Sequence, residues 1–276
     1  MTLIDGKTVS ASVKQKVAEE IKSSGINVGL AVILVGENPA SKIYVANKKK
    51  ACEAVGINSY EYLLPESTSE DELLILISKL NADKNVNGIL CQLPLPPHIN
   101  EKAVIAAISP DKDVDAFHPV NVGKIMIGDY DFLPCTPAGV MEMLNYYGIN
   151  PEGKSCVVIG RSNIVGKPMA MLLMHKNGTV TVCHSKTKNL SEITARADIL
   201  VAAVGKAKFV TADMVKEGAV VIDVGMNRDE NGKLCGDVDF AAVEPIVSAI
   251  TPVPGGVGSV TTAVLCKHVI EAAERY

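Results

Sequence analysis

The chain has 276 residues, 47% of them hydrophobic, which is typical of a globular protein with one large or two medium domains and excludes a disordered one. The formal net charge is -4 and no basic block extends beyond residues 48–50, so nucleic acid is not expected as the main partner. No apolar run approaches the roughly 20 residues that span a bilayer, and the amino terminus lacks a signal-peptide layout.

The cysteines favour a reducing compartment. There are seven, with no C-x-x-C pair, and Cys91 and Cys156 lie in apolar runs where small buried thiols are common. The five histidines form no cluster. We therefore expect a cytoplasmic protein with neither a disulfide framework nor a metal site, and without a membrane partner.

The first elements along the chain are a helix over residues 10–21, a buried strand over 30–35, and a second helix between Ser41 as N-cap and Gly56 as stop. The second helix places Tyr44 and Lys48 on one face. A lysine that is partly desolvated beside an aromatic ring has a lowered pKa and can transfer protons near neutral pH. The alternative is that residues 48–50 form a solvated charged face.

Two loops with polar side chains follow. Gln92 lies at the carboxyl end of a strand over 86–92, where ligands sit in open α/β sheets, and the prolines after it keep the loop extended. Residues 111–115 then carry three carboxylates. These could bind a metal or form a turn, and the absence of EF-hand spacing weakens the metal interpretation.

A domain boundary is expected at residues 133–137. Residues 1–137 with the final helix, 261–276, would form one domain, and residues 138–260 the other. In the second domain, strands alternate with helices, which predicts a doubly wound parallel sheet. These strands are expected at 156–159, 179–183, 199–204 and 220–224.

A phosphate site is predicted after the first of these strands. Gly160 allows a tight turn, and Gly166 and Pro168 suit the start of a helix, so backbone N–H groups and the positive end of the helix dipole would face a phosphate. Ser162 breaks the G-x-G-x-x-G spacing, which leaves an ordinary strand-to-helix turn as the alternative.

The end of the next strand favours NADP over NAD. The acidic residue that bonds the ribose of NAD is absent, whereas Ser185 and Lys186 can accept a 2′-phosphate with Arg161 reaching from the glycine turn. Further along, residues 251–259 are rich in glycine, and their bare backbone permits the close approach of a ligand. A linker is the alternative for this segment.

Six motifs in order resemble those of the bifunctional methylenetetrahydrofolate dehydrogenase/methenyltetrahydrofolate cyclohydrolase family, over essentially the whole chain. They are Gly36-Glu37-Asn38-Pro39-Ala40-Ser41 with Tyr44-Val45-x-x-Lys48, Gln92-Leu93-Pro94-Leu95-Pro96, Lys112-Asp113-Val114-Asp115, Pro134-Cys135-Thr136-Pro137, Gly160-Arg161-Ser162-x-x-Val165-Gly166-x-Pro168, and Pro252-Val253-Pro254-Gly255-Gly256-Val257-Gly258.

The resemblance implies two α/β domains around a cleft, the second Rossmann-like, a homodimer, and no metal. It implies NADP-dependent oxidation of 5,10-methylenetetrahydrofolate to 5,10-methenyltetrahydrofolate, and hydrolysis of that product to 10-formyltetrahydrofolate in one active site. The substrate would be a polyglutamylated folate, and the pathway context would be tetrahydrofolate interconversion, one-carbon metabolism and purine biosynthesis.

The resemblance also implies residue roles. Lys48 would be the essential catalytic lysine, Gln92 would tune it, Tyr44 would orient the folate, and Asp115 would bind the pterin. The remaining substrate contacts would be Gly255, Gly256 and Thr261, and the nucleotide site would be lined by Gly160, Arg161, Ser162, Gly166, Ser185 and Met226.

The chain departs from the family pattern at two places. The family usually has glycine at Ala116 and Pro-Met at Ser259-Val260. Ala116 would be strained if its turn needs a positive φ, and the other change would loosen the pterin side of the site.

Two other functions compete. A different two-domain NADP oxidoreductase, acting on a small hydroxy acid or shikimate, would need a Lys–Asp pair but not the Tyr44–Lys48 helix with Gln92. A nucleotide-sensing module without turnover would need only the second domain, and NADP binding without folate binding would favour it.

Overall fold

The computed structural model describes residues 1–275, apart from the side chain of Ala40, and it contains two parallel sheets. Residues Ala11–Cys135 with Thr262–Tyr276 form one unit, here called the three-stranded unit. Residues Met1–Ser10 with Thr136–Thr261 form the six-stranded unit. None of the helices in the described part of the chain combines the length and the apolar character needed to cross a bilayer.

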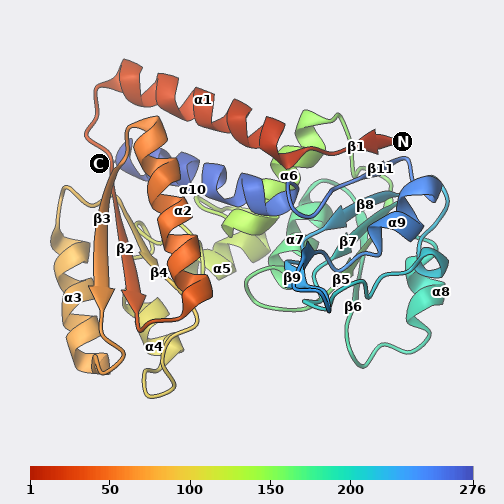
Figure 1. Ribbon diagram of the computed structural model, residues 1–276. Helices are drawn as coiled ribbons and strands as arrows, with labels where there is room; N and C mark the ends of the chain where they lie inside the picture. Colours follow the sequence, from red (N-terminus) through yellow and green to blue (C-terminus); the bar gives the residue numbers. More distant parts are fainter. Residues whose placement is uncertain (276) are drawn as a thin grey trace. The chain divides into compact units, whose positions relative to one another are not determined.

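The three-stranded unit has a parallel sheet in the order β3-β2-β4. Every residue of the central strand β2 is buried, as expected where both faces of a parallel sheet are covered. Helix α2 packs on β2 and β3 (Figure 1), while α3 supplies Leu73, Ile77 and Leu80 to a core cluster with Ile33 and Ile89. The elements are β2 (Gly29–Val35), α2 (Pro39–Val55), β3 (Asn58–Leu64), α3 (Glu70–Ala82), β4 (Gly88–Cys91), α4 (Glu101–Ala107) and α5 (Pro119–Ile127).

Helix α2 carries two of the predicted site residues, Tyr44 and Lys48. It begins at Pro39 with Asn38 as N-cap, whose side chain accepts a 3.1 Å bond from the Ser41 N–H, so the expectation that Ser41 is the N-cap is wrong. Proline at the first helical position, where no partner for its missing N–H is needed, explains the earlier start. At the other end Gly56 adopts the left-handed conformation, with φ 90°, and stops the helix as predicted.

The six-stranded unit has the order β1-β11-β8-β7-β5-β6, with every neighbouring pair parallel. The order reverses between β5 and β7, which is the topological switch point of a doubly wound sheet. The predicted α/β fold with a Rossmann-like parallel sheet is confirmed. The elements are β1 (Thr2–Leu3), β5 (Ser155–Ile159), α7 (Gly166–His175), β6 (Thr179–Cys183), α8 (Leu190–Thr194), β7 (Ile199–Ala202), η1 (Ala212–Met214), β8 (Val220–Asp223), β9 (Asn227–Arg228), β10 (Leu234–Cys235), α9 (Phe240–Val243), η2 (Glu244–Ile246) and β11 (Ala249–Ile250).

Three helices contain residues of both units: α1 (Gly6–Ser24), α6 (Cys135–Tyr146) and α10 (Val257–Ala273). The first ten residues belong to the six-stranded unit because β1 pairs with β11. This differs from the expected domain of residues 1–137 with 261–276.

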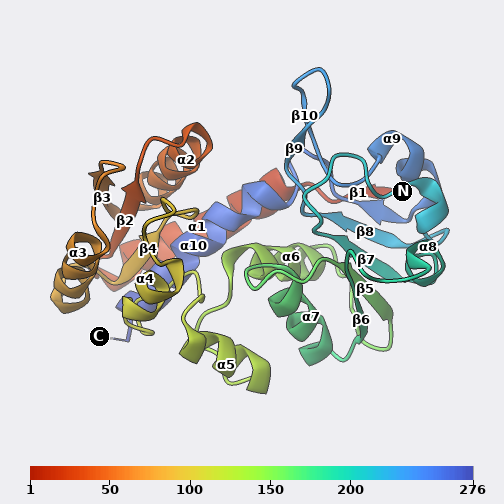
Figure 2. The same cartoon turned by 90° about the horizontal axis from the view of Figure 1, so that it is seen from below.

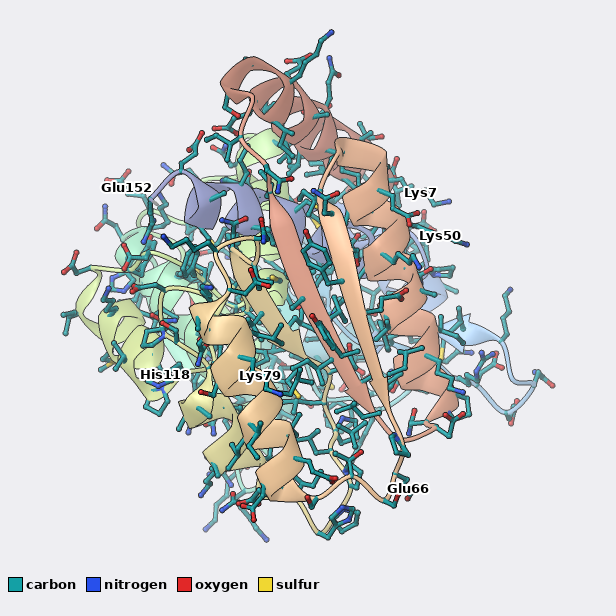
Figure 3. All side chains as sticks on the ribbon, turned by 90° about the vertical axis from the view of Figure 1, so that its left-hand side faces the viewer. Lys7, Lys50, Glu66, Lys79, His118 and Glu152 are labelled. Carbon is teal, nitrogen blue, oxygen red and sulfur yellow. The ribbon has the colours of Figure 1, made fainter. Side chains whose placement is uncertain are left out.

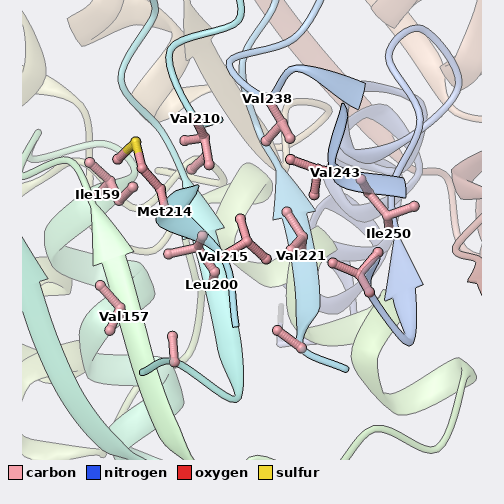
Figure 4. Packing of buried hydrophobic residues seen from close by; sticks show 14 of the residues in the cluster. Val157, Ile159, Leu200, Val210, Met214, Val215, Val221, Val238, Val243 and Ile250 are labelled. Carbon is pink, nitrogen blue, oxygen red and sulfur yellow. The ribbon is translucent and has the colours of Figure 1, made fainter. Parts of the chain in front are cut away.

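One face of the six-stranded sheet is covered by an apolar cluster (Figure 4). Val157, Leu200 and Val221 of three adjacent strands pack there against Met214 and Val243. These residues hold together the strands whose carboxyl ends carry the loops predicted to bind a nucleotide. At that edge of the sheet the antiparallel hairpin β9–β10 extends away from the rest of its unit (Figure 2).

Candidate functional site

The first part of the candidate site lies at the carboxyl ends of β2 and β4. Lys48 projects from α2, and its Nζ donates a 3.0 Å hydrogen bond to Gln92 Oε1. Gln92 is itself fixed, because its backbone N–H donates to the Ile33 carbonyl at 2.8 Å and its side-chain amide donates to the Leu93 carbonyl at 2.8 Å. The structure therefore brings these two predicted residues into direct contact from positions 44 residues apart.

Tyr44 lies one helical turn before Lys48. Its side chain is exposed, with 42% of the residue surface accessible, and the neighbouring Ile43 is 58% exposed. An exposed aromatic side chain beside a half-buried ammonium group suits the planar ring of a ligand. Lys50, two residues after Lys48, points into solvent (Figure 3).

The loop that carries Asp115 is held by two earlier residues of the same motif, Lys112 and Asp113. Lys112 is buried, and its Nζ donates to the carbonyls of Leu80 and Asp83 at the carboxyl end of α3. Asp113 accepts bonds from the His118 N–H at 2.7 Å and from Asn121 Nδ2 at 2.9 Å. Lys112 and Asp113 thus anchor the loop from which Asp115 projects.

The pKa values of these anchoring groups reflect their burial. Loss of solvent raises the pKa of the Asp113 carboxyl and lowers that of the Lys112 ammonium. Among residues 1–275 no group of three His, Cys, Asp or Glu side chains could hold a metal ion. Residues 111, 112, 114 and 115 lie in turns on either side of an isolated bridge at Asp113.

The side chains of Lys48 and Asp115 both lie close enough to Cys135 to affect the ionisation of its thiol. Burial raises the pKa of the Cys135 thiol well above its usual range, Asp115 acts in the same direction, and Lys48 opposes them. The Cys135 backbone N–H also donates to Asp115 Oδ1 at 3.4 Å. Lys48, Gln92 and Asp115 accordingly lie in one neighbourhood of the three-stranded unit.

Ala116, where glycine is usual in the family pattern, is buried and has a φ of 55°. The turn therefore does require the left-handed conformation, which costs an L-residue roughly 1–2 kcal/mol.

We expect Ala116→Gly to raise the free energy of unfolding by about 0.5 kcal/mol, since relief of this strain exceeds the greater chain entropy of glycine. Thermal unfolding would measure it as an increase in Tm of roughly 1–2 °C. The matched control is Ala106→Gly, at an exposed position of helix α4. Alanine favours the helical conformation over glycine there, so this change should lower Tm. A lower Tm for Ala116→Gly would contradict the interpretation.

The second part of the candidate site begins at Gly160, directly after β5. Its φ is 137°, and a Cβ atom there would lie 2.4 Å from the Ala203 carbonyl oxygen. A Cβ atom on Gly166 would lie 2.2 Å from the Gly160 carbonyl oxygen. Both glycines are therefore required for the strand end, the turn and the amino terminus of α7 to pack at backbone distance, which is the arrangement of a dinucleotide phosphate site.

Ser162 has a definite task in this turn. Its Oγ accepts bonds from the N–H groups of Val165 at 3.2 Å and Gly166 at 3.3 Å, and so caps the start of α7. The departure from the glycine motif is thus explained by a capping hydroxyl.

Strand register places Ser185 and Arg161 at the same edge of the sheet, each just beyond the end of one of two adjacent strands. Ile159 of β5 pairs with Cys183 of β6, and the Gly160 N–H donates to the Cys183 carbonyl at 2.9 Å. The segments that follow the two strands therefore start side by side. Both Arg161 and Ser185 are exposed. A guanidinium and a hydroxyl at the end of this strand fit a ribose 2′-phosphate, and with the glycine turn they fit NADP.

Met226 follows β8 and is 48% exposed. A Cβ atom on Gly258 would lie 2.9 Å from Met226 Cε, so the side chain extends over the start of α10.

The glycine-rich segment has structural reasons for its composition. Gly255 has a φ of 106°, its carbonyl accepts a 2.9 Å bond from the Gly6 N–H, and a Cβ atom on Gly256 would lie 2.4 Å from the Pro252 carbonyl oxygen. Thr261 Oγ1 donates to the Val257 carbonyl at 3.2 Å. These contacts account for the glycines and the threonine without a ligand, and their contact with substrate remains a prediction.

Val260 is fully buried and faces Gly139, so it is a core residue of its unit. The expectation that it loosens the edge of the pterin site is therefore not supported by its position.

Two buried aspartates beside the candidate site, Asp223 and Asp237, are residues that the sequence did not indicate. Asp223 ends β8 and Asp237 follows β10, and each accepts at least three hydrogen bonds from loops at the carboxyl edge of the six-stranded sheet. Their partners are up to 33 residues away in the chain, and no spacing rule indicates such a network.

Two family models match this chain. Residues 4–115 match the catalytic domain of tetrahydrofolate dehydrogenase/cyclohydrolase, and residues 134–276 match its NAD(P)-binding domain. Lys48, Gln92 and Asp115 lie in the first range, and the Gly160 turn lies in the second.

Individual relatives match along the whole chain. The Bifunctional protein FolD of Acetivibrio thermocellus is 60% identical over 275 residues, which cover 99% of this chain and 96% of the relative. The structure of the bifunctional FolD enzyme of Campylobacter jejuni is 52% identical with a TM-score of 0.97, covering 100% and 99% of the two chains. The FolD structure of Trypanosoma brucei, complexed with NADP cofactor and inhibitor, is 37% identical with a TM-score of 0.95, covering 100% and 98%.

Proposed function

Because this chain belongs to the tetrahydrofolate dehydrogenase/cyclohydrolase family, we propose that it oxidises 5,10-methylenetetrahydrofolate with NADP and hydrolyses the 5,10-methenyltetrahydrofolate formed to 10-formyltetrahydrofolate. The observation that carries the proposal is the Lys48–Gln92 hydrogen bond beside Tyr44 and Asp115. A nucleotide sensor has no need of this constellation, and it lies in the residues matched to the catalytic domain.

The oxidation requires alignment more than acid–base chemistry. NADP, when bound, accepts a hydride from the methylene carbon, and the resulting cation is stabilised by the nitrogens of the folate itself. Tyr44 and Asp115 orient the folate, while the Gly160 turn, Arg161 and Ser185 hold the nucleotide. The carbon that is oxidised is also the carbon to which water adds, so we assign both reactions to one active site.

The hydrolysis requires proton transfers, and Lys48 is positioned to make them. Water adds to the methenyl carbon and loses a proton, and a folate nitrogen must gain a proton as the ring opens. The Gln92 carbonyl oxygen holds Lys48 Nζ at 3.0 Å and so fixes the direction from which the amine reaches the reacting atoms. Gln92 thereby assists without exchanging protons itself.

Three further parts of the proposal rest on the family resemblance. They are a homodimer, a polyglutamylated folate as substrate, and the division of labour between a folate-binding three-stranded unit and an NADP-binding six-stranded unit. A cytoplasmic location is proposed from the seven cysteines and the absence of a C-x-x-C pair.

A paired assay on the purified protein tests the function. We expect NADP reduction in the presence of methylenetetrahydrofolate and, in a separate reaction without nucleotide, loss of methenyltetrahydrofolate absorbance. Activity in the first assay only would identify a dehydrogenase without cyclohydrolase activity. NADP binding with neither activity would favour the sensor.

A further inference from the structure

Asp237 is completely buried, and both oxygens of its carboxylate accept hydrogen bonds. Oδ2 accepts bonds from the backbone N–H groups of Val204 at 2.5 Å and Gly205 at 3.1 Å, and Oδ1 accepts one from Lys206 at 2.9 Å. Oδ1 also accepts a 2.9 Å bond from Asn227 Nδ2. One carboxylate thus determines the course of the loop after β7 and ties it to the residues after β8.

Asp223 holds the backbone around Asp237. It accepts bonds at 2.9 Å from the N–H groups of Gly225, Asp237 and Val238. A Cβ atom on Gly236 would lie 1.8 Å from Asp223 Oδ2, so the backbone closes tightly around this carboxyl. Burial raises the pKa of Asp223 to about 6.

Asp237 holds the loops after β7 and β8, and both strands lie on the same side of the switch point between β5 and β7. The loop after β7 contacts the glycine turn, because a Cβ atom on Gly160 would lie 2.4 Å from the Ala203 oxygen. Ser185, assigned to the 2′-phosphate of the adenosine half, follows β6 on the other side of β5. Since a dinucleotide lies across the switch point with its pyrophosphate at the turn, the nicotinamide half lies over the ends of β7 and β8.

We propose that Asp237 is a positioning residue for the nicotinamide half of NADP, acting through the backbone of residues 204–206 and through Asn227. The proposal rests on the proposed function, since it requires NADP as the ligand. Its distinctive consequence is that loss of the Asp237 carboxylate weakens binding of the nicotinamide half while leaving the adenosine half unaffected.

The test is calorimetric titration of the full chain with NADP and with adenosine 2′,5′-bisphosphate, which lacks the nicotinamide half. We expect Asp237→Asn to weaken NADP binding by about tenfold, because an amide NH₂ would face backbone donors, and to change binding of the bisphosphate by less than about twofold. Ser185→Ala should weaken both ligands. Asp229→Asn is the matched control, since Asp229 accepts backbone bonds in the exposed hairpin turn, and it should weaken neither.

If Asp237→Asn does not fold, Asn227→Ala removes one hydrogen bond to the same carboxylate. It should also weaken NADP binding and leave bisphosphate binding unchanged, with a smaller loss of NADP affinity than Asp237→Asn. An equal loss for both ligands, or no loss for NADP, would show a merely structural role and overturn the proposal. Failure of the unmodified protein to bind either ligand would instead overturn the proposed function, and with it the role of Asp237.

Discussion

A Lys48→Met variant is expected to hydrolyse methenyltetrahydrofolate at least about 100-fold more slowly than the unmodified enzyme, which is the range over which a positioned proton-transfer group acts. Methionine keeps the length of the side chain and removes the ammonium group that donates to Gln92. The loss of methenyltetrahydrofolate absorbance measures this effect directly. NADP affinity should stay unchanged, because every residue assigned to the nucleotide lies in the other unit.

The matched control for this experiment is Lys50→Met. Lys50 lies on the same helix but is exposed, so the variant carries the same change of charge without touching Gln92. It should retain nearly full activity. Full cyclohydrolase activity in Lys48→Met would show that the proton transfers are made by another group, and the catalytic assignment would then be wrong.

The elements with an unambiguous apolar pattern could be predicted from the sequence. The strand Thr179–Cys183 has the predicted bounds, and the run before Gly160 is a buried strand of the six-stranded sheet. β3 (Asn58–Leu64) does not stand out because it lies at an edge and is only partly buried, so polar residues interrupt its apolar ones. β1, two residues long, has no pattern of its own and forms only because it pairs with β11.

For the candidate site, the limit of prediction is sequence separation. Helical spacing placed Tyr44 and Lys48 on one face, and the rule for strand ends selected Gln92, but only the fold shows the bond between Lys48 and Gln92. Ser162 appeared as a defect in a glycine motif, whereas its hydroxyl caps α7. Six motifs together identify the family, and the family models confirm it. The preference for NADP rests on Arg161, Ser185 and Lys186, and the matched family model describes an NAD(P)-binding domain.

Gly166→Ala is expected to produce the opposite defect from Lys48→Met, namely loss of NADP-dependent oxidation with hydrolysis retained. A Cβ atom at this position would lie 2.2 Å from the Gly160 oxygen and 2.7 Å from the Arg161 nitrogen. Both are backbone atoms, which cannot rotate away as a flexible side chain can. The amino terminus of α7 must therefore move off the turn, and the positive end of the helix dipole then leaves the position proposed for the phosphate.

We expect NADP affinity to fall by at least about tenfold and the free energy of unfolding to decrease by about 1–3 kcal/mol, the usual cost of overpacking. Titration with NADP and denaturant unfolding measure the two quantities. Gly123→Ala is the matched control, because Gly123 lies within α5 and a Cβ atom there meets nothing within 4 Å. Alanine also favours a helix over glycine by about 1 kcal/mol, so this control should bind NADP normally and be slightly more stable. Unchanged NADP affinity in Gly166→Ala would mean that the phosphate does not lie at this turn, and an ordinary strand-to-helix connection would then be the correct interpretation of residues 155–168.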